Sequence, residues 1–170
     1  LENYPGPEIG DIDGIARWLD EHRPSHWTPG IMHGDYHAAN VMFSHTGPDL
    51  VAIVDWEMCT IGDPLLDLGW MIATWPPPGQ DAVLGQALMD AEGLCRTTDL
   101  VNRYAANTTR DLSGITWYAV LACFKLAIIL EGSHARAAAG LAPREIGDLL
   151  HASAVRLLER AHGLIEGDDQ

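Results

Sequence analysis

Basic residues are scarce in this chain, and lysine is almost absent. Of its 170 residues, 10 are lysine or arginine and 24 are aspartate or glutamate, which gives a formal net charge of −14. Lys125 is the one lysine. A surface with such an excess of negative charge repels nucleic acids and anionic membranes, so we expect neither as a partner.

Cysteine and long apolar runs are also scarce. The three cysteines, Cys59, Cys95 and Cys123, lie far apart and form no CxxC pair, so we expect reduced thiols, two of them in the core, and a cytoplasmic protein. No uninterrupted apolar run reaches the roughly 18 residues that a bilayer span needs. The chain opens with Leu1 and without a basic segment before an apolar one. We therefore expect a fragment of a longer protein with no secretory signal.

The composition is otherwise that of a folded globular domain. Hydrophobic residues make up 47% of the chain and charged residues 20%, which argues against intrinsic disorder. A chain of 170 residues suits one domain, because domains typically span about 100–200 residues. We therefore expect a single unit over residues 1–170.

Apolar spacing predicts a mainly α fold with one small β-hairpin. Two short β-rich runs, 41–43 and 50–54, flank the turn pair Gly47-Pro48 and predict the hairpin. The segment 113–136 is apolar on nearly every side, which indicates a central helix covered by others. Helical periodicity extends over further segments, namely 11–22, from Pro64 to about residue 75, 81–94, 98–107, and onward from Pro143.

Three oxygen-bearing side chains flank the hairpin. Asp35 and Asn40 precede its first strand, and Asp55 follows its second. Because a hairpin places the start of its first strand beside the end of its second, these side chains can converge. Two carboxylates and one amide oxygen suit Mg²⁺. Phosphoryl transfer needs such a metal on the phosphates and an acidic residue that orients the acceptor hydroxyl.

Three motifs in this region resemble those of the aminoglycoside/choline phosphotransferase family. They are HGDYHAAN at 33–40, VDWE at 54–57 and GDPLLDL at 62–68. The resemblance implies a protein-kinase-like fold, of which this chain is the C-terminal lobe. The catalytic loop and metal-binding hairpin then occupy 31–57, and a helical subdomain occupies 63–164. The segments FKLA at 124–127 and EG at 131–132 are similar to the branch linked to acyl-CoA dehydrogenase-type proteins.

The resemblance implies a role for each candidate site residue. Asp35 is the expected catalytic residue, and Asn40 and Asp55 are the expected Mg²⁺ ligands. His37, Asn40 and Asp55 are expected to contact the ATP cofactor. The implied activity is ATP- and Mg²⁺-dependent transfer of phosphate to a hydroxyl group of a small molecule.

Two further residues are implied to support the catalytic loop. His33 is expected to pack behind the loop and hold its backbone by hydrogen bonds, and Asp67 is expected to brace it from the following helix. Asp63 is expected to cap that helix. The acceptor stays open between an antibiotic, a choline-like alcohol, a sugar and a hydroxyacyl metabolite.

The same resemblance implies that half of the active site lies on an N-terminal β-lobe that is absent from these residues. Family kinases hold the nucleotide with a lysine on that lobe, whereas Lys125 lies inside an apolar segment. No glycine-rich phosphate loop precedes His33, and the 32 residues before it are too few for a five-stranded lobe. We expect the catalytic lobe to be inactive alone, with the missing lobe as its partner.

Two other functions remain open. A metal-dependent hydrolase could use His33, Asp35 and His37 as ligands, although zinc needs further ligands and neither His45 nor His134 has convincing spacing. A kinase-like domain without catalytic activity could instead serve as a binding module.

Overall fold

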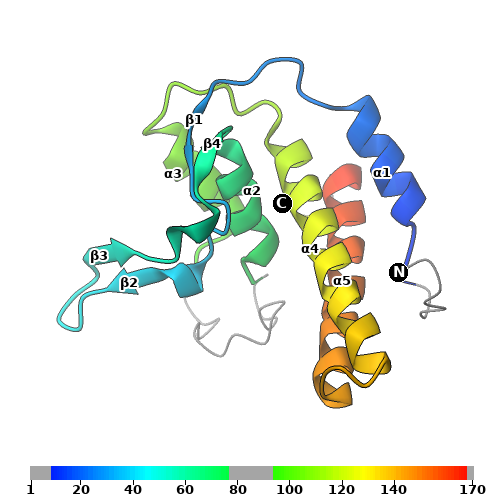
Figure 1. The fold of residues 1–170 in the computed structure, drawn as a ribbon. Coiled ribbons are helices and arrows are strands. Elements are labelled where there is room, and N and C mark those ends of the chain that lie inside the picture. Colours follow the sequence, from blue (N-terminus) through cyan, green and yellow to red (C-terminus); the bar gives the residue numbers. More distant parts are fainter. Residues whose placement is uncertain (1–8, 77–93, 168–170) are drawn as a thin grey trace.

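The computed structural model describes residues 9–76 and 94–167. Over these residues the chain is mainly helical, with two small antiparallel sheets, in agreement with the predicted class (Figure 1). The helix predicted over 81–94 lies outside the described residues, apart from its last position.

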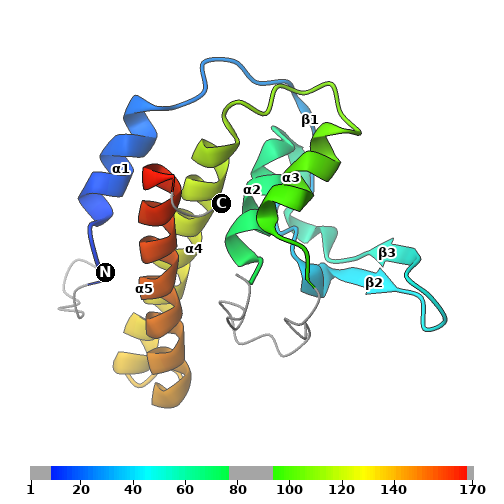
Figure 2. The same ribbon diagram turned by 180° about the vertical axis from the view of Figure 1, so that it is seen from behind.

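A central helix, α4 (Ile115–Ala138), organises the helical part. It packs against α5 (Arg144–Glu166) on one side and α2 (Leu65–Thr74) on the other, as Figures 1 and 2 show. By length and apolar composition α4 could cross a bilayer, yet 44% of its most apolar stretch is buried inside the fold. The expected central helix is therefore present, but its neighbours cover it only in part, since Ile128 and Ile129 are 40% and 50% exposed.

Two smaller helices complete this part of the chain. Helix α1 (Ile12–Glu21) begins at Asp11, whose side chain accepts a hydrogen bond of 2.8 Å from the backbone N–H of Gly14. It contacts α4 and α5, while α3 (Thr97–Ala105) packs against α2. The core includes side chains with at most 1% exposure from α1, α4 and α5, namely Ile15, Val120, Cys123, Leu157 and Leu158.

The predicted hairpin is present. Strands β2 (Val41–Phe43) and β3 (Leu50–Ile53) pair antiparallel, and β3 is one residue shorter than expected. A second pair, β1 (Gly30–Met32) and β4 (Thr60–Gly62), was not expected. The hairpin projects away from α1 and α5 in both views (Figures 1 and 2).

The expectation of two core cysteines was wrong. Cys123 is buried on α4, but Cys59 and Cys95 are exposed. Cys59 lies in the short segment that leads into β4, where the backbone is at the surface. Among the described residues no disulfide joins these cysteines, in agreement with the reduced thiols expected.

Candidate functional site

The strand pairing alone brings the two motif-bearing segments together. One segment runs from the end of β1 to the start of β2 and contains Asp35 and Asn40. The other runs from the end of β3 to the start of β4 and contains Asp55. Because β1 pairs with β4 and β2 pairs with β3, both segments must lie between the two sheets and side by side.

Hydrogen bonds at Val54 hold the two segments in register. The backbone N–H of Val54 donates to the carbonyl of Asn40 at 3.0 Å. Its carbonyl lies 2.8 Å from Nε2 of His33. Both backbone groups of the residue before Asp55 therefore bond to the HGDYHAAN loop.

His33 is a buried histidine, 3% exposed, with both ring nitrogens occupied. The backbone N–H of Asp35 lies 3.3 Å from its Nδ1, which must then act as an acceptor. Nε2 must therefore carry the proton and donate to the carbonyl of Val54. Its ring also lies 4.7 Å from the Trp56 ring, centre to centre. A neutral His33 thus links both segments through its fixed tautomer.

Asp67, on the first turn of α2, lies under the start of the loop. Its carboxylate oxygens accept hydrogen bonds from the backbone N–H groups of His33 at 2.6 Å and Gly34 at 2.8 Å. Burial raises the pKa of the Tyr36 hydroxyl, and the negative charge of Asp67 raises it further. These are contacts of a residue that supports the loop, and their effect on activity stays a prediction.

Asp35 and Asn40 are in direct contact. The Nδ2 group of Asn40 donates to the backbone carbonyl of Asp35 at 2.9 Å and lies 3.3 Å from its carboxylate. Asn40 is 8% exposed, whereas the side chain of Asp35 is 29% exposed. Among the described residues no donor bonds to Oδ1 of Asn40. The amide thus holds Asp35 with its nitrogen and leaves its oxygen available as a ligand.

His37 completes the loop. It caps the short 3₁₀ helix η1 (Ala38–Asn40), and its Nδ1 accepts a hydrogen bond of 3.2 Å from the N–H of Ala39. Its Nε2 therefore carries a proton in the neutral form and lies 3.4 Å from the Asp35 carboxylate. His37 is thus placed to orient Asp35; whether it contacts ATP stays a prediction.

Asp55 has an unusual backbone. Its φ of 64° makes it the one non-glycine residue with positive φ in the described ranges. Such conformations cost energy for a residue with a Cβ and persist where the surrounding structure imposes them. The flanking bonds of Val54 and the 3₁₀ helix η2 (Trp56–Met58) impose it here. The side chain of Asp55 is exposed and has no hydrogen bond or ion pair to the described residues.

The donor set fits Mg²⁺ better than zinc. Asn40 and Asp55 offer uncommitted oxygens, which a hard cation prefers. The alternative triad of His33, Asp35 and His37 lacks a converging geometry, because both nitrogens of His33 are engaged elsewhere. No group of these three residues is among the metal-compatible clusters of the described residues.

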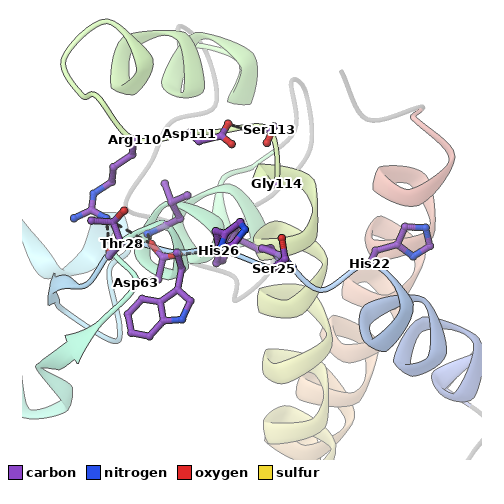
Figure 3. A pocket seen from close by; sticks show the side chains of 13 residues that line it. His22, Ser25, His26, Thr28, Asp63, Arg110, Asp111, Ser113 and Gly114 are labelled. Atoms are coloured by element: carbon purple, nitrogen blue, oxygen red, sulfur yellow. Dashed lines mark hydrogen bonds and ion pairs between the residues drawn. The ribbon is translucent and has the colours of Figure 1, made fainter.

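A cavity of about 330 Å³ lies beside α2 and the start of α4 (Figure 3). Asp63, 7% exposed, accepts hydrogen bonds there from the N–H of Leu65 at 3.1 Å and from the hydroxyl of Tyr118. Arg110 lies 3.9 Å from the same carboxylate and donates to the carbonyl of Thr28. Asp63 therefore caps α2, as expected, and also joins Tyr118 and Arg110 in one polar cluster.

Sequence reasoning missed this polar cluster because its members are distant in the chain. Arg110 and Thr28 are 82 positions apart, and no motif surrounds the arginine. The local sequence offered one indication, Asp63 directly before Pro64, and an aspartate at that position is also typical of a helix N-cap.

Comparison with known proteins agrees with the site geometry. A model described as "Phosphotransferase enzyme family" matches residues 2–102. A candidate aminoglycoside phosphotransferase from Ralstonia eutropha has a similar crystal structure, with a TM-score of 0.71 and 29% identity; the match covers 93% of this chain and 50% of that one.

Curated relatives are much longer proteins. Acyl-CoA dehydrogenase family member 10 of Mus musculus is 25% identical over 149 residues, 83% of this chain and 14% of that protein. Member 11 of Gallus gallus is 28% identical over 145 residues, 81% of this chain and 19% of that protein. The resemblance to the acyl-CoA dehydrogenase-linked branch is thus confirmed, although the chain spans a fifth or less of these relatives. With more than half of its length matched by the family model, the chain belongs to the phosphotransferase enzyme family.

Proposed function

We propose that this chain is the catalytic lobe of an ATP- and Mg²⁺-dependent kinase that phosphorylates a hydroxyl group of a small molecule. The observation that carries the proposal is the pairing of Asp35 with Asn40 in a loop held beside Asp55 by both backbone groups of Val54. Family membership makes phosphoryl transfer the chemistry that this arrangement serves.

Asp35 orients the acceptor hydroxyl and accepts its proton as the phosphate is transferred. Two neighbouring donors, Nδ2 of Asn40 and Nε2 of His37, lie 3.3 Å and 3.4 Å from its carboxylate. They hold its orientation, while the 29% exposure of the side chain leaves room for the acceptor. The loop therefore presents a preorganised carboxylate.

Asn40 and Asp55 would hold Mg²⁺ through their free oxygens. The ion, when bound, supplies charge neutralisation on the phosphates of ATP. The chain's own part is to keep the two ligands on adjoining segments, because the Val54 hydrogen bonds prevent the segments from separating.

An apolar face supports the proposal of a second lobe. Large side chains of the hairpin and its surroundings are 46–67% exposed, which includes Ile31, Met42, Phe43, Leu50, Val51 and Trp56. Large exposed apolar side chains gathered in neighbouring segments indicate an interaction site. We propose that an N-terminal lobe of the longer protein, with the lysine that holds the nucleotide phosphates, covers this face.

The acceptor class follows from the relatives rather than from the site. Acyl-CoA dehydrogenases act on acyl-CoA, and proteins of that name carry the segment similar to this chain. We propose a hydroxyl-bearing acyl compound as the acceptor, ahead of an aminoglycoside, a choline-like alcohol or a sugar.

The test is phosphate transfer by the full-length protein that contains this chain. It is incubated with radiolabelled ATP, Mg²⁺ and hydroxyl compounds of these four classes. Asp35→Asn should lower the rate about 10²–10⁴-fold, because it removes the proton acceptor. Asp13→Asn on the exposed side of α1, away from the hairpin, is the matched control and should retain the rate. An unchanged rate in Asp35→Asn would refute the role of Asp35, and no transfer to any class would refute the kinase.

A further inference from the structure

A second cluster of metal-compatible side chains lies near the end of α4 and the start of α5. Glu131 and His134 belong to α4, and His151 belongs to α5. One potential ligand atom from each lies within 4.8 Å of the others. The cluster falls outside residues 2–102, which the family model matches, and takes no part in the proposed phosphoryl transfer.

The two helices approach closely at this point. A Cβ on Gly147 of α5 would lie 2.5 Å from Cβ of Ala137 and 3.3 Å from Cδ2 of His134. Glycine at 147 thus lets α5 come close enough for His151 to reach Glu131. The spacing of Glu131 and His134 by three positions places both on one face of α4.

Glu131 is the centre of the cluster. Its Oε1 lies 3.2 Å from Nδ1 of His134, and its Oε2 lies 2.8 Å from Nδ1 of His151. The side chains of Glu131, His134 and His151 are 14%, 12% and 21% exposed. Two imidazole nitrogens and a carboxylate therefore face one another in a sheltered but reachable position.

A fourth residue, Asp148, lies beside His134, where its carboxylate can orient the imidazole ring. Nε2 of His134, on the far side of the ring from Glu131, is 3.6 Å from a carboxylate oxygen of Asp148. Histidines that bind a metal with one nitrogen commonly donate the other N–H to a carboxylate, which fixes the ring and its tautomer. Asp148 is thus an independent feature that suits His134 to a metal.

We propose that Glu131, His134 and His151 bind a divalent transition metal of the zinc type and so join α4 to α5. Two histidines and one glutamate form a known zinc ligand set, in which a fourth position is left to water or another ligand. Imidazole ligands select such metals over Mg²⁺ or Ca²⁺. Zinc ligands lie about 2.0–2.2 Å from the ion. The three ligand atoms, which now lie within 4.8 Å of one another, must therefore turn toward one common centre.

Binding requires a change of tautomer. In the metal-free state the Nδ1 protons of both histidines face Glu131. When Nδ1 becomes the ligand, the proton of each ring moves to its own Nε2, and Nε2 of His134 lies 3.6 Å from the Asp148 carboxylate.

Zinc titration of the chelator-treated, buffer-exchanged chain tests the proposal. Calorimetry should show one zinc per chain, and a rise in melting temperature should accompany it because the metal binds the folded state. The double variant His134→Ala, His151→Ala and the single variant Glu131→Gln should each bind at least about tenfold more weakly, since the site loses ligands. Circular dichroism of the metal-free variants must match the parent, and Glu131→Gln preserves shape if the double variant unfolds.

Two controls separate this site from other zinc ligands. His162→Ala removes another histidine of α5 and should leave zinc binding unchanged. The exposed thiols are a second possible source of binding, so Cys59→Ser, Cys95→Ser should also leave it unchanged. The proposal would be overturned if the parent bound no zinc, or if Glu131→Gln and the double variant bound zinc as tightly as the parent. The three side chains would then form only a hydrogen-bonded link between α4 and α5.

Discussion

At the residue scale, Asp67 offers the sharpest test of how the loop is held. Asp67→Ala leaves the N–H groups of His33 and Gly34 without their acceptor. Because hydrogen bonds to a charged group contribute about 1.5–3 kcal/mol each, we expect a loss of about 2 kcal/mol or more in the free energy of unfolding. Urea unfolding measures it. Asp67→Asn, which keeps one acceptor oxygen, should lose less; equal losses would contradict the argument.

Tyr118 provides a prediction about pH. Its hydroxyl donates to the buried carboxylate of Asp63, and burial, followed by that bond, raises the pKa of the phenol well above its usual value. In the unfolded chain the phenol ionises at about pH 10. The contribution of Tyr118 to the free energy of unfolding is therefore fully present below that pH and is lost as the pH rises further.

The matching experiment compares melting temperatures between pH 8 and 11. Tyr118→Phe should be less stable by about 1 kcal/mol near neutral pH because one hydrogen bond is lost. It should also lose stability less steeply above about pH 10, since one titrating group is gone. Parallel pH profiles for the two proteins would count against this account.

The sequence predicted contacts between residues where a motif surrounds them and missed contacts elsewhere, while the roles of the site residues stay predictions. The contacts of His33 and Asp67 follow from the HGD and GDPLLDL motifs. The contact of Arg110 with Asp63 and Thr28 depends on chain segments far apart, which no local pattern encodes.

At the element scale, the packing of α2 on α4 depends on Gly69. A Cβ at this position would lie 2.6 Å from the backbone carbonyl of Tyr118. Gly69→Ala should therefore push the helices apart and cost about 1–3 kcal/mol, the usual range for overpacking. Thermal or denaturant unfolding measures the cost.

Gly132 is the matched control for this substitution. A Cβ there meets no atom within 4 Å, although the residue also lies inside a helix. Gly132→Ala should stabilise the chain by about 0.5–1 kcal/mol, because alanine is the better helix former. The prediction fails if the two variants change stability in the same direction.

Helices were predicted within a few residues because their apolar spacing is long and regular. Helix α4 begins two positions later than expected, and α5 begins directly after Pro143. The β1–β4 pair was missed because three-residue strands carry no detectable alternation, and only the tertiary pairing defines them.

At the scale of the whole molecule, the proposed second lobe determines nucleotide affinity. The chain alone should bind ATP–Mg²⁺ weakly, since the surface around its hairpin is open and Lys125 lies over the Trp70 ring, 5.1 Å from its centre. Calorimetry on the isolated chain and on the longer protein measures the difference. Submicromolar binding by the isolated chain would show that a second lobe is not needed.

The pairing of β1 with β4 and of β2 with β3 has a consequence for how the site arises during folding. Strands β1 and β4 pair with each other, and every residue from Asp35 to Asp55 lies between them in the chain. The loop that must close to assemble the site is therefore short. Short loops cost little entropy and close rapidly. This centre can thus form early, while helices α4 and α5 are still being synthesised, and it should tolerate inserted sequence at the 44–49 turn better than within 33–40.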